Sequence, residues 1–491
     1  MVTRNKGAWR GWNFRRHRAG SPVQASVVFC LAVAAATYVS FPTDAEAETI
    51  ESALARAYEN NPQLNAQRAI VRQNDEGVSQ ALSGYRPTVS ANATLQRQYT
   101  DLKQAIPATP PFLPNSVTFA AKGMSTPRSV GASVSQTLYN GNQTGNRVRA
   151  AESQVSAARE TLRVMEQSVL LAAATAYMDM ARDTANLEVQ QNNVKVLDRT
   201  LTDTKNRFNA GAVTDTDVAQ SESQLAAGQA NLHGAEAALQ TTRANYRRII
   251  GVDPVNLAPA SSVERLAPGT LNNAIALGVA QNPNVLAAMY GVDVALLQVK
   301  IAEGALYPNL SAQYAVQYNA YPQLLAPRTF TDTFGLNLSV PIYQGGTEYA
   351  TIRSNKEAVG QQQQNVDQVR DQTRADVVTA WAQLQAAKAQ IEAAQRQNAA
   401  AERALNGVRN EAQAGQRTTQ DVLIAEQNLV NARQNLIVAQ HDRVVASYSL
   451  LSAVGRLSAR DLALPVTIYD PTVHYQQVRD AWIGVRTPSG Q

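Results

Sequence analysis

The sequence predicts an α+β membrane protein in which long α-helical hairpins and pairs of β-strands both occur twice. Three observations support this fold class. Short motifs recur in the same order at offsets of 221 and 204 residues. Long stretches without proline repeat apolar residues every seven positions, which is typical of coiled helices. Four runs of about ten residues alternate apolar and uncharged polar side chains, as membrane-spanning strands do.

The duplication is visible in motifs of both halves. Asn61-Pro62 recurs as Asn282-Pro283, and residues 138–141 (LYNG) recur as 342–345 (IYQG). The offset changes by 17 residues between Ser90 and Tyr139, so we expect a longer loop in the first copy, because loops absorb insertions at low entropic cost. We therefore divide the chain into four parts: an export signal (residues 1–47), a first repeat (48–270), a second repeat (271–463) and a C-terminal tail of undefined role (464–491).

The first 47 residues have the pattern of a cleaved export signal. Six basic residues precede an apolar run from Val23 to Val39, and residues 45–47 (AEA) offer a cleavage site between small residues. The signal holds six of the 44 basic and two of the 39 acidic residues, which leaves 38 and 37 in the mature chain. The basic pI therefore arises mainly from the signal, and no nucleic-acid partner is expected. The only cysteine, Cys30, lies inside the apolar run, so a lipid anchor at the cleavage point is not expected.

Four segments have the period of two that strands require. Each has one apolar face and one almost uncharged polar face, and each is long enough to cross a bilayer when tilted: residues 88–99, 130–138, 310–319 and 334–342. Tyrosines near the strand ends suit a girdle at the membrane interface: Tyr99, Tyr139, Tyr318, Tyr321 and Tyr343. Four half-buried strands of a soluble sheet would show the same alternation, but the export signal and the uncharged faces favour the membrane.

Four strands cannot close a transmembrane barrel, for which about eight are the practical minimum. No stretch after the signal has the ~18 uninterrupted apolar residues of a spanning helix, so a membrane crossing must be a barrel. The chain must then form an oligomer that covers the sheet edges. Two copies would give a barrel filled by side chains, whereas three would leave a lumen. We expect a homotrimer with a twelve-stranded barrel.

The stretch between Gly145 and Phe208 lacks proline and glycine and predicts one very long helix. Its apolar residues recur every seven positions, with a stutter in the middle: Val155, Leu162, Val169, Ala176, then Leu187, Val194, Leu201 and Phe208. About 64 residues at ~1.5 Å each would span ~95 Å, more than a globular core needs. The second copy repeats the seam with smaller residues between Val359 and Val408, which lets helices approach closely. An ordinary antiparallel coiled coil is the alternative.

A glycine turn follows each long helix. Gly211 and Gly415 can adopt positive φ at the helix end. Either of two threonines in each turn can cap the returning helix: Thr214 or Thr216, and Thr418 or Thr419. The acidic residues that follow, Asp217 and Asp421, suit the positive end of that helix. Good turn chemistry alone explains much of both motifs.

No motif in the sequence indicates an enzyme, a cofactor or a metal. The histidines after the signal are His233, His441 and His474, and we expect His233 and His441 on solvated helix surfaces, because neither has a partner at metal-binding spacing. Phosphate loops and nucleophile motifs are also lacking in the sequence. Two other classes remain open: an exported trimeric coiled-coil stalk or adhesin, and an outer-membrane tether without a lumen. The duplication with two strand pairs argues against the stalk.

Two motifs carry a resemblance to a known family: residues 338–346 (LSVPIYQGG), where a strand leads into a helix, and 414–423 (AGQRTTQDVL), a turn whose sister spans 210–218. With them, the mature chain resembles the TolC family of outer-membrane exit ducts, in its branch without a lipid anchor. The resemblance implies a homotrimer with a twelve-stranded barrel in outer-membrane lipid of a Gram-negative bacterium and a helical tunnel through the periplasm. It also implies passive efflux or type I secretion with a periplasmic adaptor and an inner-membrane pump of the ABC or RND type. The sequence does not specify the cargo.

The same resemblance assigns roles to the turns. Arg417 matches an arginine that latches neighbouring hairpins at the closed end of the tunnel, with Thr216 and Asp217 at its partner positions. Asp421 matches a carboxylate ring that attracts cations to the entrance. Two departures weaken this match, since Ala412 replaces a latch tyrosine and Ile424 stands where a second acidic ring is expected. The expected adaptor contacts are Gly211, Ala212, Val213, Gly415, Gln416 and Arg417.

Overall fold

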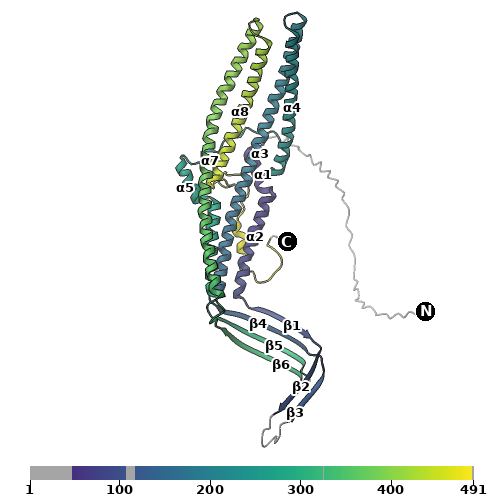
Figure 1. Cartoon of the computed structure of the whole chain (residues 1–491), viewed down its shortest axis with the longest axis vertical. Coiled ribbons are helices and arrows are strands. Elements are labelled where there is room, and N and C mark those ends of the chain that lie inside the picture. Colours follow the sequence, from purple (N-terminus) through teal and green to yellow (C-terminus); the bar gives the residue numbers. More distant parts are fainter. Residues whose placement is uncertain (1–46, 107–116, 324–325, 489–491) are drawn as a thin grey trace, which may run out of the picture. The chain divides into compact units, whose positions relative to one another are not determined.

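The computed structural model describes residues 47–106, 117–323 and 326–488, and the part from Ala47 onward is one folded unit (Figure 1). The export signal expected over residues 1–47 lies outside the described residues, apart from Ala47. The same holds for most of the loop expected after Ile106.

Helices and strands occur twice in the same order. The first copy holds α1 (Ile50–Asn60), α2 (Pro62–Leu82), β1 (Thr88–Leu95), β4 (Arg128–Asn140), α3 (Gln143–Asn209) and α4 (Asp215–Ile250). The second copy holds α5 (Leu271–Gln281), α6 (Pro283–Gly304), β5 (Asn309–Gln323), β6 (Ala326–Ser339), α7 (Thr347–Gln413) and α8 (Thr419–Val454). Helices α3 and α7 each contain 67 residues, and α4 and α8 each contain 36. The predicted duplication of long helical hairpins is therefore confirmed, whereas the repeat boundaries at residues 270 and 463 stay predictions.

Four strands form an antiparallel sheet in the order β1-β4-β5-β6, and the β4–β5 pair joins the two copies. The four predicted strands are thus confirmed, with two corrections. The first ends at Leu95, and Tyr99 belongs to a separate strand, β2 (Gln98–Ile106), which pairs with β3 (Val117–Ser125). Pro127 lies in the break opposite, where its missing N–H interrupts the ladder. The extra length of the first copy is therefore partly a β-hairpin rather than a loop. The last strand ends at Ser339, so Val340 and Ile342 lie beyond it.

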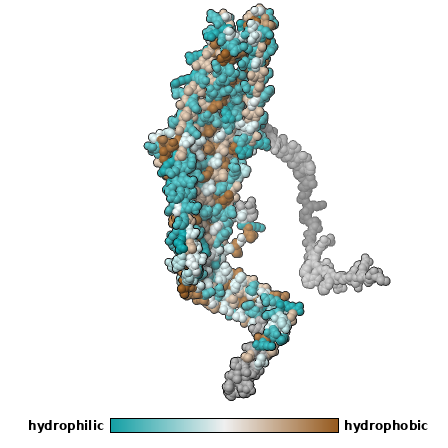
Figure 2. Space-filling view, viewed as in Figure 1, coloured by the Kyte–Doolittle hydropathy of each residue, from teal (hydrophilic) through white to brown (hydrophobic). Residues whose placement is uncertain are grey.

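Large apolar side chains of this sheet are exposed. Val89, Leu95, Phe330 and Phe334 are each about 70% exposed within one chain. Figure 2 shows a hydrophobic patch where the helices meet the sheet. The exposed aromatic and aliphatic residues that adjoin the helix and strand ends there are Tyr85, Tyr139, Tyr307, Ile342 and Tyr343. We refer to these five residues as the junction girdle. Such a distribution is typical of a barrel surface that contacts lipid, with amphipathic rings at the interface.

The heptad seam of α3 continues without the predicted stutter. Val155, Leu162, Val169 and Ala176 are buried as expected, but the buried positions that follow are Asp183, Gln190, Leu197 and Thr204, again seven apart. The predicted residues Leu187, Val194 and Leu201 are only half-buried, and Phe208 is 43% exposed. Two of these polar residues have partners on α4: Thr242 donates to Asp183 at 2.5 Å, and Ser221 donates to Thr204 at 3.4 Å.

One helical segment in the described part of the chain, Leu271–Gly304, passes the length and composition test for a membrane span, with a mean hydropathy of 1.6 and 22% of that window buried. Polar residues such as Asn282 and Asp293 interrupt this stretch, so it does not contradict the expectation that no run of ~18 uninterrupted apolar residues follows the signal. Asn282 and Pro283 divide it into α5 and α6, and α6 packs against α3 and α7. Pro283 can start a helix because the first helical position needs no N–H partner.

The main hydrophobic core lies where α1, α2, α3, α4 and α8 meet. Tyr177, Tyr246 and Tyr448 are its largest fully buried side chains. The Tyr177 hydroxyl lies 2.7 Å and 2.6 Å from the carbonyl oxygens of Glu48 and Ala258. The start of the described chain and the linker between the copies are thus held to the middle of α3. The C-terminal tail forms α9 (Pro471–Val478), which packs against α2.

Candidate functional site

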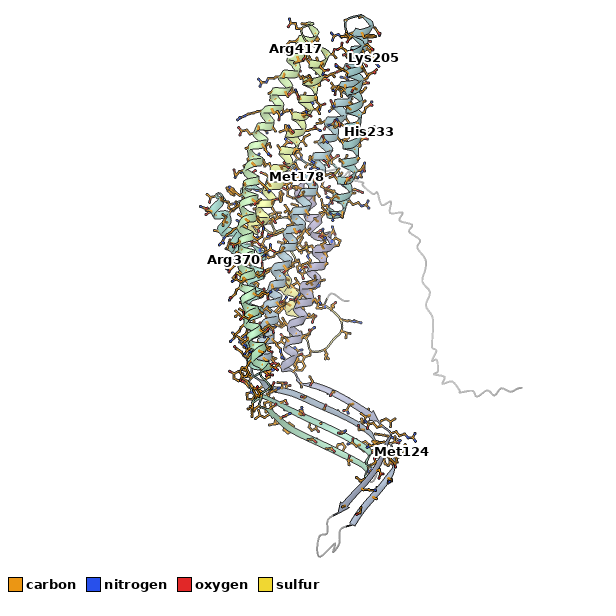
Figure 3. All side chains as sticks on the ribbon, viewed as in Figure 1. Met124, Met178, Lys205, His233, Arg370 and Arg417 are labelled. Atoms are coloured by element: carbon orange, nitrogen blue, oxygen red, sulfur yellow. The ribbon has the colours of Figure 1, made fainter. Side chains whose placement is uncertain are left out.

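The predicted functional residues gather in the two turns that close the hairpins, α3–α4 and α7–α8. Figure 3 labels Arg417 in the second of them. The turns have the same backbone geometry: φ is +74° at Gly211 and +78° at Gly415, and each glycine N–H donates to a carbonyl of the preceding helix, that of Phe208 or Ala412. The predicted positive φ is confirmed at both glycines. A Cβ at either would meet nothing within 4 Å, so both turns are open to the outside.

A capping box starts each returning helix. The Asp217 carboxylate accepts from the Thr214 N–H at 2.9 Å and from its hydroxyl at 2.7 Å. The Asp421 carboxylate accepts from Thr418 in the same way, at 3.0 Å and 2.9 Å. Thr214 and Thr418 are therefore the caps, rather than the alternatives Thr216 and Thr419. Hydrogen bonds from the threonine N–H and hydroxyl groups lower the pKa of both aspartates, so both remain ionised at neutral pH.

Within one chain, Arg417 has a different partner from the one predicted. Its Nε lies 2.8 Å from Oε2 of Glu411, and both side chains are about half exposed. In the part of the chain that the structure describes, no hydrogen bond or ion pair joins Arg417 to Thr216 or Asp217. Ala412 is buried. A latch through Arg417 therefore requires a neighbouring chain, and it stays a prediction.

The other predicted turn residues are accessible. Gly211, Ala212, Gly415 and Gln416 are exposed and Val213 is half-buried, as a surface for a partner requires. Asp421 is half-buried and Ile424 is 50% exposed, so the single acidic position borders an apolar one. A ring of three Asp421 carboxylates would attract cations.

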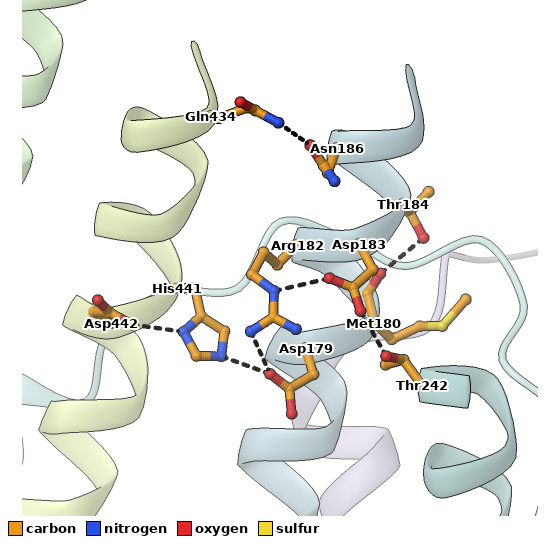
Figure 4. Close-up of polar contacts among 10 residues, drawn as sticks. All are labelled: Asp179, Met180, Arg182, Asp183, Thr184, Asn186, Thr242, Gln434, His441 and Asp442. Carbon is orange, nitrogen blue, oxygen red and sulfur yellow. Dashed lines mark hydrogen bonds and ion pairs between the residues drawn. The ribbon is translucent and has the colours of Figure 1, made fainter. Parts of the chain in front are cut away.

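A second set of contacts, which the sequence did not reveal, joins the two hairpins along α3 and α8. His441 lies 3.0 Å from Asp179, Gln434 donates to Asn186 at 2.9 Å, and Glu426 approaches Thr200 at 3.5 Å (Figure 4 for the first two). We call these three pairs the α3–α8 rungs. The α3 members lie at multiples of seven residues, so they share one face of the helix. The contact between hairpins is thus polar rather than apolar along much of its length.

His441 is the central residue of the first rung, and the expectation of a solvated helix surface is wrong for it. Only 9% of His441 is exposed, and its ring nitrogens lie 3.0 Å from Asp179 and 2.8 Å from Asp442. Arg182 extends the network by bridging Asp179 and Asp183 at 2.8 Å each (Figure 4). Burial opposes protonation of the imidazole, but the hydrogen bonds to the two carboxylates outweigh it and raise the pKa of His441. The hydrogen bond from His441 lowers the pKa of Asp179.

Glu426, in the rung nearest the turns, also belongs to an ion pair that recurs in the first copy in a different environment. Lys205 pairs with Glu222 in the first copy and Arg409 with Glu426 in the second, at 2.8 Å and 2.9 Å. Glu222 is half exposed, whereas the Glu426 side chain is only 4% exposed because it faces α3. A cavity of about 590 Å³ adjoins Glu426 and is lined by α3, α7 and α8. The hairpins are therefore packed less tightly near their turns.

In the described ranges, no cluster of histidine, cysteine and acidic side chains is arranged to hold a metal ion. The fold and the site thus describe a protein with long helical hairpins at one end and, at the other, a sheet with exposed apolar side chains.

Comparison with known proteins identifies this class of protein. Residues 53–252 and 275–456 match the family described as outer membrane efflux protein, and the chain belongs to that family. It is 39% identical over 445 residues to the outer membrane efflux protein BepC of Brucella suis, covering 90% of this chain and 93% of BepC. Among solved structures, the CmeC channel of Campylobacter jejuni has a TM-score of 0.72 at 16% identity, with 88% of this chain and 89% of CmeC covered. VceC of Vibrio cholerae has a TM-score of 0.68 at 19% identity, with 83% and 96% covered.

The predicted resemblance, fold class and location are confirmed by these matches. The protein is an outer-membrane channel-tunnel that extends into the periplasm of a Gram-negative bacterium, and trimers are typical of its family. The stalk, adhesin and tether alternatives are set aside.

Proposed function

We propose that the trimer is the passive exit duct of a tripartite efflux or type I secretion system, and that the two turns of each chain form its gate. The observation that carries this proposal is the length of α3 and α7. Their 67 residues separate the sheet from the turns by about 100 Å at ~1.5 Å per residue. A duct anchored in the outer membrane by its strands would thus present the turns deep in the periplasm.

An inner-membrane pump of the ABC or RND type and a periplasmic adaptor supply the energy in this proposal, because the mature sequence offers no nucleotide-binding motif or catalytic group. The adaptor contacts are the exposed turn residues Gly211, Ala212, Val213, Gly415, Gln416 and Arg417. The two turns have the same geometry, so an adaptor of repeating structure would find matching surfaces around the trimer.

Deleting the gene is expected to reveal which class of cargo the duct carries. If the duct serves efflux, the strain becomes several-fold more sensitive to toxic compounds; if it serves type I secretion, a secreted protein disappears from the medium. Complementation with the wild-type chain must restore either phenotype. A deletion strain that matches its parent in both assays, in a host without a second such duct, would contradict the proposal.

Replacing Arg417 with serine is expected to enlarge the single-channel conductance of purified trimers in planar bilayers. Charge-assisted hydrogen bonds from arginine would favour the closed arrangement of neighbouring hairpins, so their loss shifts the gate toward the open state. Glu411→Gln is the matched control. It removes the negative charge that pairs with Arg417 within the chain and keeps the arginine itself for a neighbouring chain.

The two variants separate the possible roles of Arg417. A larger conductance in Arg417→Ser but not in Glu411→Gln supports a latch between chains. Equal conductance in wild type and Arg417→Ser would remove Arg417 from the gate while leaving the duct intact. Folded trimers without any current would reject the duct itself.

A further inference from the structure

The C-terminal tail is fixed to the outside of α2 by buried polar contacts. Nδ1 of His474 in α9 lies 3.0 Å from the Asp75 carboxylate of α2, which is fully buried. Arg159 of α3 lies 3.9 Å from the same carboxylate, and its guanidinium lies 5.4 Å from the Tyr475 ring centroid. A fully buried carboxylate needs such partners, because a charge left alone away from water is costly. The tail is therefore held in place by specific side-chain contacts and is part of the fold.

Beyond α9 the tail is held at the place where the chain enters the sheet. Nη1 of Arg86 donates to the Ala481 carbonyl at 2.6 Å, and Ser79 donates to the same oxygen at 3.4 Å. The Arg86 guanidinium lies 4.9 Å from the Trp482 ring centroid. Arg86 precedes the first residue of β1, Thr88, by only two positions. The tail is thus brought to the level of the junction girdle, since Tyr85 of the girdle is the neighbour of Arg86.

The apolar side chains of the tail next to this point are unusually exposed to solvent. Trp482 is 68% exposed, Ile483 is 96% exposed and Val485 is 100% exposed. Arg486 follows these residues in the sequence, whereas Arg479, which precedes them together with Asp480, lies 3.8 Å from Glu152 of α3. A tryptophan with neighbouring aliphatic residues and arginines is typical of segments that lie at a membrane interface, where the rings stay near the headgroups and the cations meet phosphate.

We propose that residues 481–486, held by Arg86, are an interfacial anchor that inserts Trp482, Ile483 and Val485 into the periplasmic leaflet of the outer membrane. The partner is a phospholipid surface, with Arg486 facing its phosphates. Two observations favour lipid over a protein partner: the segment is continuous with the junction girdle, and it is pinned beside the start of a membrane strand. The proposal rests on the outer-membrane location that the family establishes and not on the gate.

The fluorescence of Trp482 can show whether this side chain lies in water or in lipid. The chain has four tryptophans, of which Trp9 and Trp12 lie in the expected signal, so the mature protein has Trp381 and Trp482. A Trp381→Phe variant leaves Trp482 as the sole fluorophore. We would reconstitute it in phosphatidylethanolamine–phosphatidylglycerol vesicles whose acyl chains are brominated either near the headgroup or near the bilayer centre. The expected result is blue-shifted emission, at least twofold stronger quenching by the shallow bromines than by the deep ones, and little quenching by aqueous iodide.

A second variant provides the positional control. In Trp381→Phe/Trp482→Phe/Val473→Trp the only tryptophan is on α9, at a site that is 50% exposed and belongs to the helical part of the fold. It should be quenched by iodide and not by brominated lipid. Conductance recorded from the same vesicles shows whether each protein is folded and inserted, independently of the anchor.

Two outcomes would overturn the proposal. Quenching of Trp482 by iodide and not by lipid would place the tail in water. Protection from both quenchers would mean that a neighbouring copy of the chain covers it. Either result in conducting channels would reject the anchor while leaving the proposed duct in place.

Discussion

Replacing Gly141 with alanine is expected to reduce the folded trimer to a small fraction of wild type, whereas the same change at its sister Gly345 should be tolerated. Both glycines follow a membrane strand and both have positive φ, +63° and +69°. A Cβ at Gly141 would lie 2.2 Å from the Gly304 carbonyl oxygen and 2.9 Å from Cβ of Tyr307. A Cβ at Gly345 would meet nothing within 4 Å. Backbone atoms therefore block the first substitution and leave the second free.

The two costs differ in origin. Alanine at positive φ costs about 1 kcal/mol at either site, from the clash of its own Cβ with the backbone. At Gly141 the β4–α3 junction must also move away from the end of α6, which places this substitution among those that cost more than about 4 kcal/mol. The measurements are the yield of trimer extracted from membranes and its thermal unfolding by circular dichroism. If Gly141→Ala and Gly345→Ala behaved alike, the close approach of Gly141 to Gly304 would be wrong.

This pair marks a limit of reading structure from sequence. The motifs around Gly141 and Gly345 are almost the same, and their duplication correctly predicted a strand-to-helix junction at both. The difference between them comes from Gly304, which is distant in sequence and has no local signal. Local geometry repeats with the motif, but crowding depends on what packs against it.

The register of α3 could have been predicted better than it was. After Ala176 the buried positions are held by polar residues, namely Asp183, Gln190 and Thr204. A search for apolar residues therefore selects Leu187 as the next seam position, and this choice requires a stutter. The second copy contains the missing information: Ala387, Ala394 and Val408 stand 204 residues further on and continue one register. Comparing the copies would have shown that the seam of α3 continues with polar residues.

The candidate site also contains some features that local sequence predicts and others that depend on distant residues. Turn glycines, caps and exposed contact residues were predictable, because they depend on residues within one turn. The α3–α8 rungs were not, because Asp179 and His441 are 262 residues apart and neither has a helical neighbour that signals burial. The β2–β3 hairpin was missed because only a length difference marked it.

Raising the pH from about 6 to 8 is expected to destabilise the wild-type trimer more than a His441→Gln variant. The groups that face His441 are Asp442 on its own helix and Asp179 with Arg182 on α3, and Arg182 is held in turn by Asp183. The two carboxylates nearest the ring favour imidazolium, so the pKa of His441 is raised. A raised pKa means that the folded protein binds the proton more tightly than the unfolded chain.

The sign of the effect follows from this difference. Stabilisation by His441 is complete below the ordinary pKa of histidine, about 6.5, and is lost as the pH rises through the raised value. Asp179 has a lowered pKa, so its contribution is present above about pH 4 and is lost in acid. The first rung is therefore strongest between about pH 4 and 6.5. Its loss should cost about 1 kcal/mol per chain, the lower end for a charged hydrogen bond because Asp442 is half exposed.

Thermal unfolding of purified trimers between pH 5.5 and 8.5 tests this prediction. His233→Gln is the matched control, because His233 pairs with Glu236 on the exposed surface of α4 and ties no two helices together. The control should keep the wild-type slope of melting temperature against pH, and His441→Gln should flatten it. Parallel slopes in all three proteins would show that the rung does not titrate in this range. A flattened slope would instead show that protonation of one buried imidazole strengthens the contact between the hairpins, along the seam where any movement of α8 against α3 must occur.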